Sequence, residues 1–224
     1  MLRTMTPLSW TFLAVAAVAA VANWYAVGGA TRHGRLEFVA KPAVMLALIG
    51  VAETMTPVDT IVRAFVAAAL VLSLIGDVAL MLPRERFVGG LVAFLFAHVA
   101  YIVGLGLLVL QDWSGVGLIF GSGLVGLVMG SVGRRVFAAV RSDHPGLLGP
   151  VVAYIAVISL MVVVAFATGR PLAMAGAALF YASDATLALN RFVERRPWGR
   201  LAVIATYHLG QALLVLSLAS PLLS

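Results

Sequence analysis

Two aspartates, Asp77 and Asp184, stand inside long apolar stretches of this chain. A carboxyl group at the centre of a membrane helix costs about 2.5–3.5 kcal/mol on insertion scales, so it needs a structural or functional reason. One such residue could simply hydrogen-bond between helices. Residues 76–82 and 183–189, however, share the pattern small-Asp-x-x-Leu-x-Leu. A matched pair favours carboxyl chemistry over two unrelated structural aspartates.

The spacing of the nearest arginines indicates how deep the two carboxyls lie. Arg84 and Arg191 each follow an aspartate by seven positions, which is about 10 Å at about 1.5 Å per helical residue. We expect both helices to run in the same direction, which puts the carboxyls at one depth, in the cytoplasmic half of the membrane. Two carboxyls in a poorly hydrated bundle suit acid and base catalysis, because one can donate a proton while its ionised partner activates water.

Other polar residues fall at helical spacing near the same stretches. His98 with Tyr101, and Tyr207 and His208 with Gln211, each occupy one helix face, which must point into the bundle and not at lipid. A single buried His or Tyr is more often a structural hydrogen-bonding residue than a ligand. Together with the carboxyls, these residues predict a polar cavity.

The composition requires that membrane helices position these residues. The chain of 224 residues is 62% hydrophobic and 11% charged, whereas soluble domains are about 25% charged. Each crossing needs roughly 20 apolar residues, so about eight crossings use up the chain. The sequence predicts an all-α bundle forming a single membrane domain, residues 1–224, with no nucleic-acid partner. Its helices are predicted at residues 8–29, 38–53, 60–82, 87–110, 115–133, 148–168, 171–190 and 199–222.

The arginines and lysine predict the orientation. Alternating the loops puts 12 Lys and Arg residues on one side and 3 on the other, namely Arg3, Arg63 and Arg170. Because positively charged short loops stay in the cytoplasm, we expect both termini outside, in a bacterial-type plasma membrane. The first apolar run resembles a signal peptide, but it is too long for one, so we expect it to be retained.

Two further patterns concern packing and symmetry. Six glycines between Gly115 and Gly130 predict that helix 115–133 packs closely against neighbours. The offset of the two matched aspartate segments suggests that the chain consists of two diverged four-helix halves. Lys41 lies near the cytoplasmic interface, where it could bind a phosphate as a point charge or simply extend its amine to the interface.

Taken in order, several segments resemble the lysoplasmalogenase or YhhN-like family of integral membrane proteins. The matching residues are Lys41-Pro42, Met45, Ser73, Gly76-Asp77, Leu80-Met81, Gly90, Phe94, Ala97-His98, Tyr101, Tyr154, Met161, Gly176-Ala177, Leu179-Phe180, Ser183-Asp184, Leu187-Ala188, Asn190-Arg191-Phe192, Tyr207 and Gln211. The resemblance covers the chain from Lys41 onward, and the first helix carries none of it.

The resemblance implies an eight-helix hydrolase that cleaves the vinyl ether of lysoplasmalogens into a fatty aldehyde and a glycerophospho-base. It implies Asp77 and Asp184 as the catalytic pair, with no metal or cofactor. The implied partners are a lysophospholipid substrate and membrane lipids, and the natural substrate stays open. The residues that we expect to bind the substrate are Lys41, Ser73, His98, Tyr101, Asn190, Tyr207 and Gln211.

Two other functions fit the residues. His98 and His208 with one aspartate could bind zinc in a lipid hydrolase, although no two histidines have the spacing of a metal-binding helix. Asp77 and Asp184 could instead relay protons in a coupled transporter, with the two halves as its moving units.

Overall fold

The computed structural model describes residues 4–28, 34–56, 58–82 and 86–219, and this part of the chain contains helices and no strand. The helices are α1 (Pro7–Gly28), α2 (Gly34–Thr54), α3 (Thr60–Met81), α4 (Phe87–Gln111), α5 (Gly115–Val128), η1 (Met129–Gly133), α6 (Arg134–Asp143), η2 (Pro145–Leu147), α7 (Leu148–Ala167), α8 (Pro171–Ala188), η3 (Leu189–Val193), α9 (Gly199–Leu216) and η4 (Ser217–Ala219). The short π-helical turn η1 joins α5 and α6 into one continuous helix. The described chain therefore has eight long helices, as predicted.

Seven of these helices are long and apolar enough to cross a membrane. The exception, α2, has 21 residues and pairs with α1 along its length. It carries Glu37, Lys41 and Glu53, which lower its hydropathy without shortening it. The predicted multi-pass integral membrane protein is confirmed.

Several helices extend beyond their predicted ends. α2 begins at Gly34, not at residue 38, and the helix predicted to end at residue 133 continues through η1 to Asp143. The helix predicted to end at residue 190 continues as η3 to Val193. Hydropathy marks where the chain leaves lipid, whereas a helix bearing charged residues can continue into water. Arg3, Arg32, Arg84 and the predicted helix end at residue 222 lie outside the described residues.

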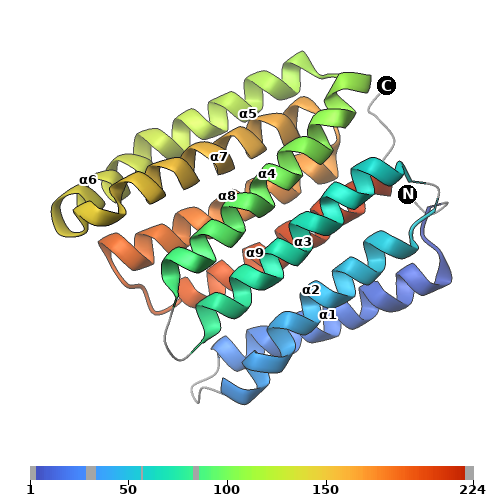
Figure 1. Cartoon of the computed structure of the whole chain (residues 1–224), viewed down its shortest axis with the longest axis horizontal. Helices are drawn as coiled ribbons and strands as arrows, with labels where there is room; N and C mark the ends of the chain where they lie inside the picture. Colours follow the sequence, from blue (N-terminus) through green and yellow to red (C-terminus); the bar gives the residue numbers. More distant parts are fainter. Residues whose placement is uncertain (1–3, 29–33, 57, 83–85, 220–224) are drawn as a thin grey trace.

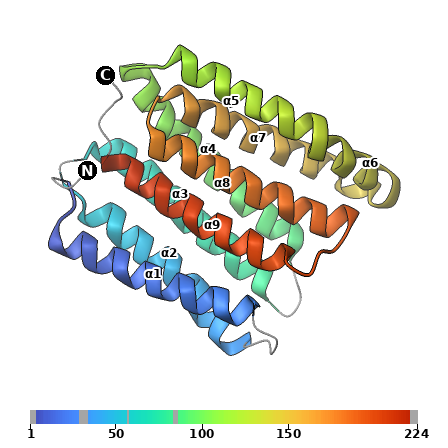
Figure 2. The ribbon, with the colours of Figure 1, turned by 180° about the vertical axis from the view of Figure 1, so that it is seen from behind.

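The long helices alternate in direction, so the start of α1 and the end of α9 lie at the same end of the bundle (Figure 1). Seen from behind, α9 lies between the α1–α2 pair and α8 (Figure 2). The α3–α4 pair and the α8–α9 pair form opposite sides of the bundle. Helices α3 and α8 therefore run in the same direction, as the aspartate pattern predicts.

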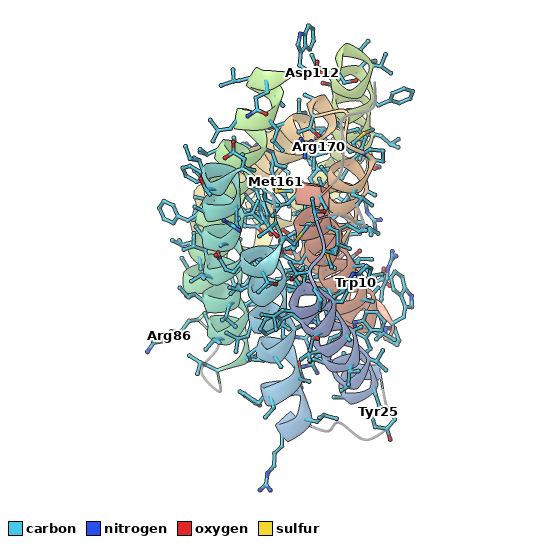
Figure 3. The ribbon with its side chains drawn as sticks, turned by 90° about the vertical axis from the view of Figure 1, so that its right-hand side faces the viewer. Trp10, Tyr25, Arg86, Asp112, Met161 and Arg170 are labelled. Carbon is cyan, nitrogen blue, oxygen red and sulfur yellow. The ribbon has the colours of Figure 1, made fainter. Side chains whose placement is uncertain are left out.

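Most of the described arginines gather at one end of the bundle. Arg86 lies at the end opposite Asp112 and Arg170, with Met161 between them (Figure 3). The starts of α2, α4 and α9, the helix α6, and η3 with the loop after it lie toward the Arg86 end (Figure 1). They carry Arg35, Arg86, Arg134, Arg135, Arg141, Arg191, Arg195, Arg196 and Arg200.

Glycine allows close helix contact at two places. A Cβ at Gly176 of α8 would lie 2.8 Å from the backbone nitrogen of Leu214 in α9, and Gly210 meets the α8 backbone in the same way. In α5, Gly117 and Gly121 pack against Phe166 of α7. The predicted close packing of this helix thus rests on Gly117 and Gly121, whereas Gly123, Gly126 and Gly130 face open space.

Candidate active site

Asp77 of α3 is buried and has two side-chain partners on other helices. Lys41 Nζ of α2 lies 2.9 Å from Asp77 Oδ1, and the Tyr207 hydroxyl of α9 donates to Asp77 Oδ2 at 2.9 Å. Lys41 is itself buried. A buried carboxylate is tolerated when it is paired and hydrogen-bonded, so this arrangement suits the ionised form of Asp77.

A chain of neutral hydrogen bonds lies one turn away on the same faces. Ser73 is four residues before Asp77, and its hydroxyl accepts a 3.0 Å hydrogen bond from Gln211 Nε2. Gln211 Oε1 accepts a hydrogen bond from the Tyr101 hydroxyl of α4. All three side chains are buried. These hydrogen bonds join α3, α4 and α9, and they limit the positions that Tyr207 and Asp77 can take.

Asp184 of α8 has a different environment. Its Oδ2 accepts a hydrogen bond from the Tyr154 hydroxyl of α7 and lies 3.9 Å from His98 Nε2 of α4. Among the described residues no Lys or Arg pairs with it. Its side chain is 13% exposed, compared with 2% for that of Asp77. Asp184 is thus the more accessible carboxyl, and no strong cation compensates its charge.

Aromatic rings occupy the space between the two aspartates. Phe180 stacks edge-on against His98 at 4.9 Å and against Tyr207 at 5.3 Å between ring centroids. His98 also meets the Tyr154 ring at 5.3 Å. The carboxyls are near enough to interact electrostatically. The site therefore has two polar ends and an aromatic wall, which suits a substrate with a polar head and an apolar chain.

The two aspartates have equivalent helices around them. Asp77 contacts α2, the helix before its own, and α9, the last helix of the chain. Asp184 contacts α7, the helix before its own, and α4, the last helix of the first half. Each carboxyl thus hydrogen-bonds or pairs with a residue of its own half and lies within 4 Å of a residue on the last helix of the other half. A parallel repeat of four helices predicts this arrangement.

Most of the predicted site residues come together here, and Asn190 does not. Asn190 lies in η3, where its Oδ1 accepts a hydrogen bond from the backbone nitrogen of Arg196 at 3.2 Å, which holds the loop between α8 and α9. His208 packs against Trp24 and Tyr207, and His98 faces Asp184. Among the described residues no three His, Cys, Asp or Glu side chains are placed to bind a metal, so the zinc set of both histidines and one aspartate does not assemble.

Two residues of the site were not among the predicted site residues. Tyr154 binds Asp184, and Phe180 separates the two polar ends. Tyr154 could have been found because it is a polar side chain in an otherwise apolar run. Phe180 has no such signal, since an aromatic residue in a membrane helix usually only packs.

Comparisons with known proteins identify relatives of this chain. The sequence pattern described as the YhhN family matches residues 36–218. The chain is 33% identical over 154 residues to human lysoplasmalogenase TMEM86B, an alignment covering 68% of this chain and 63% of the relative. It is 36% identical over 149 residues to the mouse protein of that name, covering 66% of this chain and 61% of the relative.

A bacterial relative shows similar identity. The chain is 34% identical over 169 residues to the lysoplasmalogenase of Mycobacterium bovis, covering 73% of this chain and 62% of the relative. The chain thus spans somewhat under two thirds of the length of these curated relatives. No solved structure matches it. The family pattern covers α2 to α9 with both aspartates, and the chain belongs to the YhhN family.

Proposed function

We propose that this chain is a membrane-embedded hydrolase that cleaves the vinyl ether of lysoplasmalogen-type lysophospholipids into a fatty aldehyde and a glycerophospho-base. The observation that carries the proposal is the pair of buried aspartates with unlike partners, Lys41 at Asp77 and Tyr154 at Asp184. Relatives named lysoplasmalogenase support the substrate class.

The partners indicate which aspartate is the acid. Lys41 compensates the charge of Asp77, which favours its carboxylate form. Asp184 has no Lys or Arg partner among the described residues, and the nearby Asp77 carboxylate opposes a second negative charge, which favours a protonated Asp184. The greater exposure of Asp184 lets it face the substrate. Asp184 is therefore the general acid, and Asp77 is the carboxylate that activates water and stabilises the developing cation.

The reaction then needs only these two groups and water. Asp184 gives its proton to the alkene carbon farther from the ether oxygen, and that oxygen shares the resulting positive charge as an oxocarbenium ion. Water adds to the carbon next to that oxygen and loses one proton to Asp77. The hemiacetal collapses: its hydroxyl proton passes to the leaving glycerol oxygen, the carbon–oxygen bond breaks, and the aldehyde forms. Transfer of the proton from Asp77 to Asp184 restores the site. This division of labour resembles that of inverting glycoside hydrolases.

The remaining residues position the substrate and the acid pair. His98 and Phe180 form the wall along which the alkenyl chain lies, and the chain of Tyr101, Gln211 and Ser73 holds the α4–α9 side of the site. Lys41 is engaged by Asp77, so its role is charge compensation at the site, not capture of a free phosphate.

The charge distribution supports an orientation for this site. The arginine-rich end of the bundle lies in the cytoplasm by the positive-inside rule, which puts both termini outside. Asp77 is four residues from the end of α3, so the site lies in the cytoplasmic half of the membrane.

The test is aldehyde release by purified protein offered alkenyl and acyl lysophospholipids side by side. We expect aldehyde from the alkenyl lipid and no fatty acid from the acyl lipid. Asp77→Asn and Asp184→Asn should each lower the rate by about 10²–10⁴-fold, with the thermal midpoint measured for each. Asp112→Asn, at the far end of α4, is the matched control and should keep full activity.

Other outcomes would overturn the proposal. Proton-coupled uptake by proteoliposomes without any product would indicate a transporter. Loss of activity on chelation and recovery with zinc would indicate a metal hydrolase.

A further inference from the structure

A second polar cluster lies beside the catalytic pair, between α1, α2 and α9. Asn23 of α1 is completely buried and His208 of α9 is 2% exposed. Neither side chain makes a hydrogen bond to any residue that the structure describes, and the same holds for the buried indole nitrogen of Trp24. Unsatisfied polar groups cost several kcal/mol in a bilayer, so three of them together indicate a ligand-binding site.

The helix register brings this cluster to the level of Lys41. Thr54 Oγ1 donates to Ser9 Oγ at 3.0 Å, which sets α1 against α2. Asn23 follows Ser9 by fourteen positions and Lys41 precedes Thr54 by thirteen, which is about 20 Å along each antiparallel helix. Asn23 and Lys41 therefore lie at the same depth.

Contacts across α1 and α9 complete the placement. The Trp24 and His208 rings stack with centroids 6.4 Å apart, and His208 is close enough to Lys41 to interact electrostatically. His208 also adjoins the ring of Tyr207, whose hydroxyl binds Asp77. The unpartnered groups therefore adjoin the Asp77 side of the catalytic site.

The chemistry of the cluster points to an uncharged ligand that both donates and accepts hydrogen bonds. The Asn23 amide has donors and an acceptor, Trp24 has a donor, and an uncharged imidazole at His208 has one of each. Lys41 is already paired with Asp77. A phosphate here would add a second negative charge beside the Asp77 carboxylate without a free cation at the cluster. A hydroxyl group matches the set.

We propose that Asn23, Trp24 and His208 form a subsite that binds the free glycerol hydroxyl of a lysophospholipid. The inference rests on the proposed function. In such a lipid the free hydroxyl lies on the carbon next to the one that bears the vinyl ether, so a ligand held at Asp77 brings it toward this cluster. A second acyl chain on that oxygen removes the donor and adds bulk, so the subsite selects lysolipids over diradyl lipids. Asn23 and Trp24 lie outside the family pattern, which begins at residue 36.

The test measures binding without hydrolysis. The probes are a lysophospholipid with a saturated alkyl ether, which cannot be protonated as an alkene, and its deoxy analogue lacking the free glycerol hydroxyl. Their dissociation constants are measured on the purified full chain in detergent micelles. We expect the hydroxyl-bearing lipid to bind at least tenfold more tightly, as for sites built to hydrogen-bond a hydroxyl.

Variants assign this preference to the cluster. Asn23→Leu and His208→Phe should each reduce the preference to less than about threefold, by weakening binding of the hydroxyl-bearing lipid alone. Trp24→Phe, which removes only the indole donor, should reduce it in part. Thr206→Val is the control on α9 and should retain the full preference. Among the described residues, the Thr206 hydroxyl bonds to two backbone oxygens of its own helix.

Equal binding of both probes by the unmodified protein would overturn the subsite, as would an unchanged preference in the His208→Phe and Trp24→Phe variants. The latter two decide the question if Asn23→Leu does not fold. The binding test and the reaction test can fail separately. A hydroxyl preference without aldehyde release would support the subsite and contradict the proposed hydrolase. Aldehyde release without a hydroxyl preference would support the hydrolase and contradict the subsite.

Discussion

Lys41 and Asp77 form a buried ion pair between α2 and α3, with 2.9 Å between Nζ and Oδ1. Removing one partner of such a pair leaves a buried charge uncompensated, which costs about 3–5 kcal/mol. We therefore expect Lys41→Met to lower the thermal midpoint strongly and to abolish aldehyde release. Adding Asp77→Asn to it should restore much of the stability and none of the activity.

An exposed ion pair serves as the control for this prediction. Arg200 Nη2 lies 2.6 Å from Glu37 Oε1, and the Arg200 side chain is 47% exposed. Arg200→Met should cost at most about 1 kcal/mol. Equal shifts of the midpoint in Lys41→Met and Arg200→Met would contradict the buried ion pair.

Tyr154 is expected to help Asp184 give up its proton, because its hydroxyl can stabilise the carboxylate that remains. Its hydroxyl donates to Asp184 Oδ2, so Tyr154→Phe removes that donor and keeps the ring that packs on His98. We expect kcat to fall about 10–100-fold, because the transition state loses this hydrogen bond; each factor of ten corresponds to about 1.4 kcal/mol. KM should change little. Steady-state kinetics on the alkenyl lipid measures both constants.

The control for Tyr154 is another tyrosine in a neighbouring helix. The Tyr181 hydroxyl lies 2.9 Å from Ser159 Oγ, and among the hydrogen bonds of the described residues the tyrosine partners of the aspartates are Tyr154 and Tyr207. Tyr181→Phe should leave kcat within about twofold of the unmodified value. If Tyr154→Phe behaves in the same way, Tyr154 does not act on the acid.

The contact between α8 and α9 predicts unequal effects of two glycine substitutions. A Cβ at Gly176 would come within 3.0 Å of the Gly210 carbonyl oxygen and the Leu214 nitrogen, and backbone atoms cannot move aside cheaply. Gly176→Ala should therefore lower the thermal midpoint markedly, since overpacking costs about 1–3 kcal/mol or more. Gly126→Ala, which meets nothing within 4 Å, should leave the midpoint unchanged or raise it, because Ala has the higher helix propensity. If Gly126→Ala lowered the thermal midpoint more than Gly176→Ala does, Gly126 would be in a close contact that contradicts its open surroundings.

Reporter fusions test the orientation. A reporter after Arg195, in the loop before α9, should read cytoplasmic, and one at the C-terminus should read external. The physical reason is the gathering of arginines at the end of the bundle that contains this loop. Identical readings at the two positions would contradict the prediction that α9, which lies between them, crosses the membrane.

The sequence alone determined the class of the fold and the two carboxyls at its centre. Apolar runs of about 20 residues can satisfy their backbone hydrogen bonds in lipid only as helices, so the helix count and the alternating directions followed from hydropathy. Asp77 and Asp184 were identifiable because an acid in such a run is costly. Helix ends were less predictable, as at Asp143 in α6, because hydropathy reports the lipid boundary and not the last helical turn.

Only the tertiary structure decided which side chains meet. Periodicity assigns His98 and Tyr207 to inward faces, but it does not say which helix lies opposite, and association in lipid depends on detailed packing and hydrogen bonds without a hydrophobic driving force. The pairing of Lys41 with Asp77, and of Tyr154 with Asp184, therefore required the packed bundle. The packed bundle was also needed to find that Asn23 has no hydrogen-bond partner among the described residues. From the sequence alone, a single polar residue in an apolar run could equally have faced a partner in a neighbouring helix.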